Sequence, residues 1–252
     1  LIPNMKAAIA SGTPMVIVGG GNGSLSCTVD DVVDRDCVFA LLPLPTPNSF
    51  ARTLGIPLDL DGAIHTIAHG QRRKVGLGLI DGDYFANCAA IGLSSLIAEG
   101  IPPNLKKYLG RVGYFLWATW CLLRFGPFEL TVDDGRDSWT VWATEVRIAN
   151  GGYHGGVELV ESAEVDSGEI IVQAVVGRSM GRLLWDWFSK YWKLPLREAT
   201  TEEYRGRRLR LATRPRMKIS IDGEPLARTP VTVEVAHKAI EVVVPREDGR
   251  PE

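Results

Sequence analysis

The stretch MVIVGGGNGSLS, residues Met15–Ser26, decides how the chain begins to fold. Met15–Val18 is a short apolar run that ends at glycines, which is typical of a fully buried strand. Beyond the glycines apolar residues recur at helical spacing, so a helix is predicted to start near Ser24. A glycine-rich link between strand and helix presents backbone N–H groups and the positive end of a helix dipole, and both favour an anion. A tight turn without a ligand is the open alternative.

The glycine turn matches neither of two common phosphate-binding motifs. A P-loop requires G-x-x-x-x-G-K-[ST], and this segment contains no lysine. A dinucleotide fingerprint that begins at Gly19 requires a third glycine where Ser24 stands. The segment also lacks a carboxylate, so backbone amides would have to hold any phosphate.

Outward from this turn, the sequence predicts an α/β part and then a β-rich part. Cys37–Leu44 is a second buried strand, Asn48 is the N-cap of a short helix, and a further helix ends at Gly70. This alternation indicates parallel strands. From residue 75 onward, alternating runs around Asp81-Gly82 predict a hairpin, and seven later strands accompany helices over 104–125 and 181–192. Because doubly wound units normally start with an earlier strand and helix, we expect the leading part of the α/β domain to be absent from this sequence.

Composition restricts the class of protein. The 252 residues are 45% hydrophobic and 23% charged, which is ordinary for a globular chain. The net charge of -2 argues against broad attraction to nucleic acid, and no apolar segment reaches the roughly 18 residues that a membrane span requires. The four cysteines form no C-x-x-C pair and lie in apolar surroundings, so buried free thiols in a reducing compartment such as the cytoplasm are predicted.

Five motifs, in order, resemble the catalytic family of diacylglycerol kinases, which includes bacterial YegS-like lipid kinases and sphingosine kinases. GGNGS at Gly20–Ser24 is similar to the family's Gly-Gly-Asp-Gly-Thr loop. LPLPTPNSFARTLGIP at Leu42–Pro57 is similar to its Leu-Pro-x-Gly-Thr-x-Asn-Asp-Phe-Ala-Arg segment. FANCAAIGLS, IANGGYHGGVELVESAEVDSGEI and SIDGEPL resemble its Phe-x-Asn-x-x-x-x-Gly block, its Asn-Gly-x-x-x-Gly-Gly loop with the acidic turn after it, and its late Asp-Gly-Glu. Together the five matches cover nearly the whole chain.

The resemblance implies a Rossmann-like nucleotide-binding domain of the NAD-kinase and diacylglycerol-kinase type, N-terminally incomplete, with a β-sandwich-like second domain. The ATP-binding domain is expected at residues 1–74, completed by 236–252, and the lipid-substrate domain at 75–235. ATP and lipid would meet in the cleft between them. The implied enzyme transfers the γ-phosphate of ATP to the hydroxyl of a diacylglycerol-like lipid with Mg²⁺. It would be cytoplasmic and peripheral at a membrane surface, and a homodimer is left open.

The resemblance also implies residue roles. Glu224 falls where the family has its proton acceptor, and Asp222, two residues earlier, shares its face if the strand continues. Asn150 and His154 belong to a loop that would face the substrate. The acidic turn that contains Glu164, Ser167 and Glu169 matches a structural magnesium loop. The positions expected to contact ATP are Gly20, Gly21, Asn22, Gly23, Ser24, Leu25, Ser26, Cys27, Thr46 and Asn48.

Several positions depart from the family pattern. Asn22 and Ser49 each replace an Asp, Cys27 replaces a Glu, and Ser167 stands where the magnesium loop has its carboxylate, with Asp166 as a substitute. Asparagine keeps the shape of aspartate, but it cannot take a proton or bind magnesium well. Three functions therefore stay open: an active lipid kinase, a catalytically weakened relative that binds nucleotide or lipid, and a kinase for a soluble substrate such as NAD.

Two aromatic segments and one histidine pair suggest further sites. WDWFSKYWK, Trp185–Lys193, suits either a lipid–water interface or a docked amphipathic helix. VGYFLWATWCLLRF, Val112–Phe125, favours a helix packed on the β-rich domain over a membrane contact. His65 and His69 have the i, i+4 spacing of metal ligands, but no Cys or Glu-rich partner is near them in the sequence, so exposed helix residues are predicted.

Overall fold

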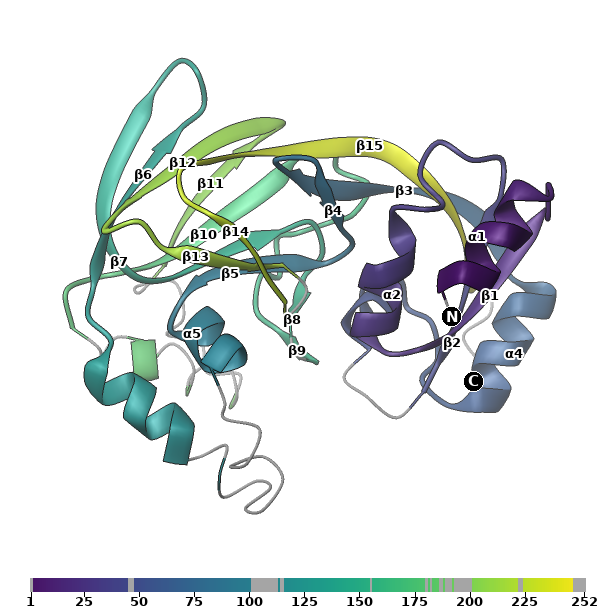
Figure 1. Cartoon of the computed structure of the whole chain (residues 1–252), viewed down its shortest axis with the longest axis horizontal. Helices are drawn as coiled ribbons and strands as arrows, with labels where there is room; N and C mark the ends of the chain where they lie inside the picture. The colour runs from purple at the N-terminus through teal and green to yellow at the C-terminus, as the bar shows by residue number, and fades with distance from the viewer. Residues whose placement is uncertain are drawn as a thin grey trace. The chain divides into compact units, whose positions relative to one another are not determined.

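The chain forms two compact units. The structure, a computed structural model, describes residues 2–44, 48–100, 113, 116–154, 156–179, 181, 183–185, 188, 192, 201–221 and 224–246. Unit 1 comprises Leu1–Cys88, Asn150–Glu169 and Glu234–Glu252, and unit 2 comprises Ala89–Ala149 and Ile170–Val233. An α/β unit and a β-rich unit agree with the predicted fold class (Figure 1).

The elements of unit 1 surround a short parallel sheet. They are α1 (Ile2–Ala10), β1 (Met15–Gly20), α2 (Asn22–Val29), β2 (Val38–Pro43), α3 (Ser49–Thr53), α4 (Leu60–His69), β3 (Gln71–Ile80), β4 (Asp83–Phe85), β8 (Tyr153–His154), β9 (Val157–Glu158) and most of β15 (Val231–Val244). β2 pairs in parallel with β1 on one side and with the end of β15 on the other. The prediction of parallel strands, with the last strand returning to the first domain, is confirmed.

The period-2 alternation of the strands gives this sheet two buried faces. Val18 and Phe39 share one core cluster with Leu25 of α2 and Met5 of α1. Ala40 lies on the opposite face, in a cluster that Ile67 of α4 borders. Helices therefore cover both faces, and the glycine turn lies where β1 gives way to α2 (Figure 1).

Unit 1 contains two segments that the sequence assigned to the β-rich domain. Residues 75–88 and 150–169 belong to it because Val75, Leu77 and Val165 are buried in the same core cluster as the strands around the glycine turn. Within the first of these segments β3 and β4 form the predicted hairpin, in which Ile80 pairs with Asp83.

The end of the chain also differs from the prediction. The runs 231–236 and 239–245 are not two strands but one, β15. Lys238, at the gap between the two runs, has a left-handed backbone with φ of 54°. The polar residues that suggested a break therefore mark an irregularity within a continuous strand.

Unit 2 is mostly antiparallel. Its elements are β5 (Cys88–Gly92, which begins at the unit boundary), α5 (Leu93–Gly100), β6 (Phe128–Asp133), β7 (Ser138–Ala149), β10 (Ile170–Val176), β11 (Thr201–Gly206), β12 (Arg208–Arg214), β13 (Lys218–Ile221) and β14 (Glu224–Arg228). The long strand β7 pairs with β6 through its first half and with β10 through its second half. Alternating residues of β6, from Phe128 to Val132, point into the core. Residues 116–124 are helical, and the rest of the helix predicted over 104–125 lies mainly outside the described residues.

A buried ionic network crosses three strands of unit 2. Arg147 is fully buried, and its Nε and Nη2 both lie 2.8 Å from Oε1 of Glu145. Arg147 Nη1 donates to Gln173 on β10 at 2.9 Å, and Gln173 donates in turn to Glu203 on β11 at 2.9 Å. Glu145 Oε2 is buried and has no hydrogen-bond partner within the described part of the chain. Such charges are costly to bury, so loss of one member alone is expected to destabilise unit 2.

The described cysteines and helices agree with what the composition predicted. Cys37, Cys88 and Cys121 are buried free thiols, as predicted, and the side chain of Cys27 lies outside the described residues. Burial raises the pKa of the Cys121 thiol, so it stays protonated at neutral pH. Among the described helices, none combines the length and the apolar character that a transmembrane span needs.

Candidate functional site

The glycine turn presents backbone donors at the start of α2. Gly21 is the N-cap and, as a glycine, contributes no side-chain capping bond. The Leu25 N–H donates to the Gly21 carbonyl at 3.2 Å, which is the first helical hydrogen bond. The amides of residues 22–24 precede it, so the helix does not use them. Together with the positive end of the helix dipole, they suit an anion.

Glycine is required at the end of β1 by a close approach. A Cβ added at Gly20 would lie 2.3 Å from Oγ of Ser24, so even alanine would force the turn to move. The turn also borders a hollow of about 20 Å³, which Asn48 and Phe50 help to line. That volume accommodates about one water molecule. A phosphate would therefore lie outside the hollow, on the amides of the turn.

Asn22 connects the glycine turn to α3. Its Oδ1 accepts a hydrogen bond from the Ser49 N–H at 2.8 Å, and its Nδ2 donates to Ser49 Oγ at 3.2 Å. It thus satisfies an orphan amide at the start of α3, because the N-cap Asn48 makes no capping bond. The Asn48 side chain donates instead to the Leu44 carbonyl at 2.7 Å. Both predicted nucleotide-binding asparagines therefore organise the loops around the turn.

A third segment reaches the same serine. The Gly156 N–H donates to Ser49 Oγ at 3.2 Å, so residues 20–24, 48–53 and 150–156 meet at Ser49, which is buried. The sequence identified Ser49 only as a departure from the family pattern and not as a site residue. Its position directly after the N-cap Asn48 was the available signal, because helix starts collect polar partners.

Asn150 and Asn87 connect neighbouring segments through further hydrogen bonds. Asn150 Nδ2 donates to the carbonyls of Gly76 and Ala86, both at 2.9 Å. Asn87 Oδ1 accepts from Thr53 Oγ1 at 2.8 Å. Both side chains are buried, and Asn150 Oδ1 and Asn87 Nδ2 have no partner among the described residues. Ordered water or a ligand atom commonly satisfies such atoms. The side-chain nitrogen of Asn150 is thus used in hydrogen bonds to backbone carbonyls. A contact between Asn150 and a substrate stays a prediction.

Several predicted site residues are described only in part. His154 pairs with Val157 across β8 and β9, and Ser26 and Cys27 lie within α2, but their side chains are outside the described part of the chain. Thr46 and Asp222 lie wholly outside it. Glu224 begins β14 and pairs with Ile221, and its side chain is likewise not described. Glu224 belongs to unit 2 and Asn22 to unit 1, so their meeting stays a prediction.

The acidic loop predicted to hold magnesium is closed by its own contacts. Ser167 Oγ donates to the Glu164 carbonyl at 2.8 Å and accepts from the Glu169 N–H at 3.2 Å. Asp166, the carboxylate expected to substitute, forms an ion pair with Arg73. Magnesium requires free oxygen ligands in near-octahedral geometry. Ser167 and Asp166 are thus engaged by the protein itself, and the described residues contain no cluster of three His, Cys, Asp or Glu side chains that could hold a metal. Magnesium binding by Glu164, Ser167 and Glu169 stays a prediction.

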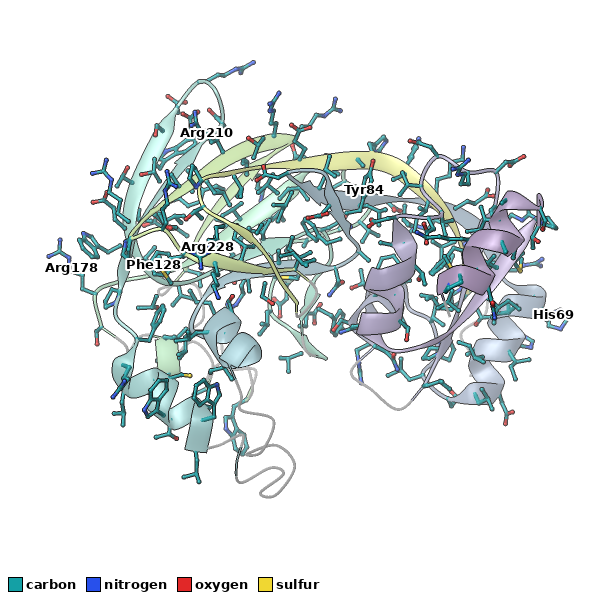
Figure 2. All side chains as sticks on the ribbon, in the orientation of Figure 1. His69, Tyr84, Phe128, Arg178, Arg210 and Arg228 are labelled. Carbon is teal, nitrogen blue, oxygen red and sulfur yellow. The ribbon has the colours of Figure 1, made fainter. Side chains whose placement is uncertain are left out.

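The histidine pair on α4 belongs to no group of three metal-binding side chains among the residues that the structure describes. His65 and His69 are exposed, with ring centroids 4.7 Å apart. Figure 2 shows His69 at the periphery of the ribbon. The prediction of exposed helix residues is confirmed for both.

Comparison with known proteins first defines the fold class. A crystal structure of a diacylglycerol kinase from Bacillus anthracis str. Sterne matches with a TM-score of 0.74 at 18% identity, over 96% of this chain and 80% of that chain. Yeast NADH kinase complexed with NADH matches with a TM-score of 0.50 at 14% identity, over 94% of this chain and 64% of that one. The fold is thus that of the diacylglycerol kinases and NAD kinases.

Sequence comparison then gives the family. Residues 3–80 match the diacylglycerol kinase catalytic domain, and residues 90–244 match the YegS C-terminal NAD kinase beta sandwich-like domain. A "Probable lipid kinase YegS-like" of Pseudomonas aeruginosa (strain UCBPP-PA14) is 30% identical over 96% of this chain and 80% of its own length. The "Diacylglycerol kinase" of Bacillus subtilis (strain 168) is 32% identical over 48% of this chain and 42% of its own length. The chain belongs to the YegS-like lipid kinases of the diacylglycerol kinase family.

Proposed function

We propose that this lipid kinase uses ATP and phosphorylates a diacylglycerol-like alcohol at a membrane surface, as a cytoplasmic, peripheral protein. The observation that carries the proposal is the glycine turn, where the amides of residues 22–24 are free of helical bonds. Backbone donors at a helix start suit the phosphates of ATP, whose magnesium would neutralise part of their charge. The names of the relatives in the YegS-like and diacylglycerol kinase families support the lipid class of the acceptor.

The proposed reaction has one transfer step. The lipid hydroxyl oxygen forms a bond to the γ-phosphorus of ATP, the bond from that phosphorus to the β–γ bridging oxygen breaks, and ADP leaves. The hydroxyl proton passes to Glu224, and Asp222 lies two residues earlier in the sequence. The Asn22–Ser49 hydrogen bonds hold the glycine turn against the start of α3, so the turn is positioned before ATP binds.

The experiment is transfer of radiolabelled γ-phosphate from ATP to diacylglycerol, with lipid-free and NAD-containing reactions beside it. Glu224→Gln should lower the rate by about 10²–10⁴-fold, as expected for loss of a general base. Glu129→Gln, a half-buried glutamate of β6, is the matched control and should leave the rate unchanged. Transfer that requires NAD and no lipid would refute the lipid acceptor. Equal rates for Glu224→Gln and the parent would refute the base.

A second function, nucleotide or lipid binding with little transfer, is favoured by one observation. The two positions where the resemblance expects aspartates are Asn22 and Ser49, and they hydrogen-bond to each other. The Asn22→Asp variant is compatible with the fold, because Ser49 can donate its hydroxyl to the new carboxylate. The second function is correct if calorimetry shows that the parent binds ATP, the parent transfers no phosphate, and Asn22→Asp gains phosphate transfer. Light scattering of the same preparations tests the homodimer.

A further inference from the structure

Unit 2 exposes an unusual group of large apolar side chains on two neighbouring helical segments. We define the apolar patch as Leu116, Trp120, Leu123, Leu184, Trp185, Phe188 and Trp192. Within the described residues of unit 2, most of the exposed large hydrophobic side chains belong to it. Single exposed hydrophobic residues are common, but a concentration of them marks an interaction surface.

The two segments share one core, which leaves their other faces outward. Cys121 of the first segment and Leu183 of the second are fully buried in one cluster with Leu93 of α5. Figure 1 shows the teal helix of residues 116–124 beside the short green helical segment. The exposed residues of the first segment follow the spacing i, i+4, i+7 at Leu116, Trp120 and Leu123, so they form one stripe opposite the buried side.

The second segment continues the same kind of surface with aromatic rings. The ring centroids of Trp185 and Phe188 are 5.8 Å apart, and those of Phe188 and Trp192 are 6.1 Å apart. Trp192 is 63% exposed and Leu123 is 80% exposed, so neither side chain is needed to fill the core. Indole rings combined with leucine are typical of residues at the boundary between lipid headgroups and acyl chains.

The two sequence segments that carry the apolar patch are basic, although the whole chain carries a net charge of -2. The sequence of residues 111–124 and 182–193 contains one acid, Asp186, against five basic residues: Arg111, Arg124, Arg182, Lys190 and Lys193. The Arg124 guanidinium lies over the Trp120 ring, 4.5 Å from its centroid, and thus stays beside the patch. An excess of basic residues in these two segments favours binding to anionic lipid.

We propose that the apolar patch is the surface through which this kinase docks on an anionic lipid bilayer. The patch enters the interface between headgroups and acyl chains, and Arg124, beside Trp120, contacts the headgroups. The proposal extends the proposed function, because it names the surface by which the enzyme would reach a lipid acceptor.

The test is flotation with vesicles that contain no diacylglycerol, so binding is measured without catalysis. The parent should bind vesicles of phosphatidylcholine with phosphatidylglycerol more tightly than phosphatidylcholine alone, and high salt should weaken the difference. Leu123→Gln and Trp192→Ser should each weaken binding about tenfold. Leu60→Gln, at a 51% exposed leucine of α4 in unit 1, is the matched control and should have no effect.

Each outcome decides for or against the docking surface. Unchanged flotation of Leu123→Gln and Trp192→Ser, with unchanged circular dichroism, overturns it. The docking surface is also overturned if the parent does not bind vesicles and instead self-associates through the patch. In that case light scattering would show that the two variants are monomeric. Vesicle binding by a parent that transfers no phosphate supports the docking surface while refuting the proposed reaction, which keeps the two failures distinct.

Discussion

Replacing Arg147 by methionine tests the buried ionic network of unit 2. Arg147→Met removes the guanidinium contacts with Glu145 and Gln173 and leaves the Glu145 carboxylate buried without its cation. Breaking a buried pair in this way costs about 3–5 kcal/mol of unfolding free energy. For a chain of this length, that loss lowers the Tm by about 6–20 °C.

The assay can follow unit 2 alone. All seven tryptophans of the chain lie in the segments 89–149 and 170–233, so tryptophan fluorescence during urea unfolding reports on that unit. The double variant Arg147→Met with Glu145→Leu should recover at least about 2 kcal/mol of the loss, because an apolar pair of similar volume replaces the ions. Arg210→Met is the matched control on β12, labelled in Figure 2. Arg210 is exposed, so this change should cost less than about 1 kcal/mol.

A loss of less than about 1 kcal/mol for Arg147→Met would refute the reasoning, because it would mean that water or another group compensates Glu145. A double variant that is no more stable than Arg147→Met would refute it in a second way. In that case the cost would come from lost packing and not from the uncompensated carboxylate.

Three other perturbations test the fold and the candidate site. Asn22→Ala removes both hydrogen bonds to Ser49 and should lower the unfolding free energy by about 1–2 kcal/mol in thermal denaturation, whereas Asn22→Asp should stay within about 1 kcal/mol of the parent. Gly92→Ala should cost at least about 2 kcal/mol, because Gly92 has φ of 119° and its new Cβ would lie 2.6 Å from the Thr144 carbonyl oxygen; near-parental urea unfolding would contradict this. Burial, with the hydrogen bond to a neighbouring carboxylate, raises the pKa of Tyr204 far above its usual value. The contribution of Tyr204 to the unfolding free energy is therefore complete below pH ~10, the usual tyrosine pKa, and is lost as the pH rises further. In that alkaline range the unfolding free energy of Tyr204→Phe should fall less than that of the parent.

Much of the fold follows from local pattern. The glycines after Val18 and the Asp81-Gly82 pair predicted a strand end and a hairpin, because both features depend on backbone conformations that short sequences specify. The membership of residues 75–88 and 150–169 in unit 1 could not be predicted in this way. It depends on which core Val75 and Val165 enter, and that is decided by residues distant in sequence.

The candidate site shows the same division. Asn22 was recognisable from its motif, but its partner Ser49 lies 27 residues away and no local pattern joins the two. The acidic loop suggested a cation because Glu164, Asp166 and Glu169 are close together in sequence. Arg73, which pairs with Asp166, lies 93 residues earlier, so no local pattern indicates that an arginine side chain occupies that carboxylate.

The order of segments along the chain has a consequence for biosynthesis. Unit 2 is complete at Val233, whereas unit 1 still lacks Glu234–Glu252 at that point, including the part of β15 that lies beside β2. Domains usually fold on the ribosome in the order in which they are made. Here the residues of unit 1 that are made first must wait for β15, so the β-rich unit can fold first and unit 1 is completed only after β15 has been made.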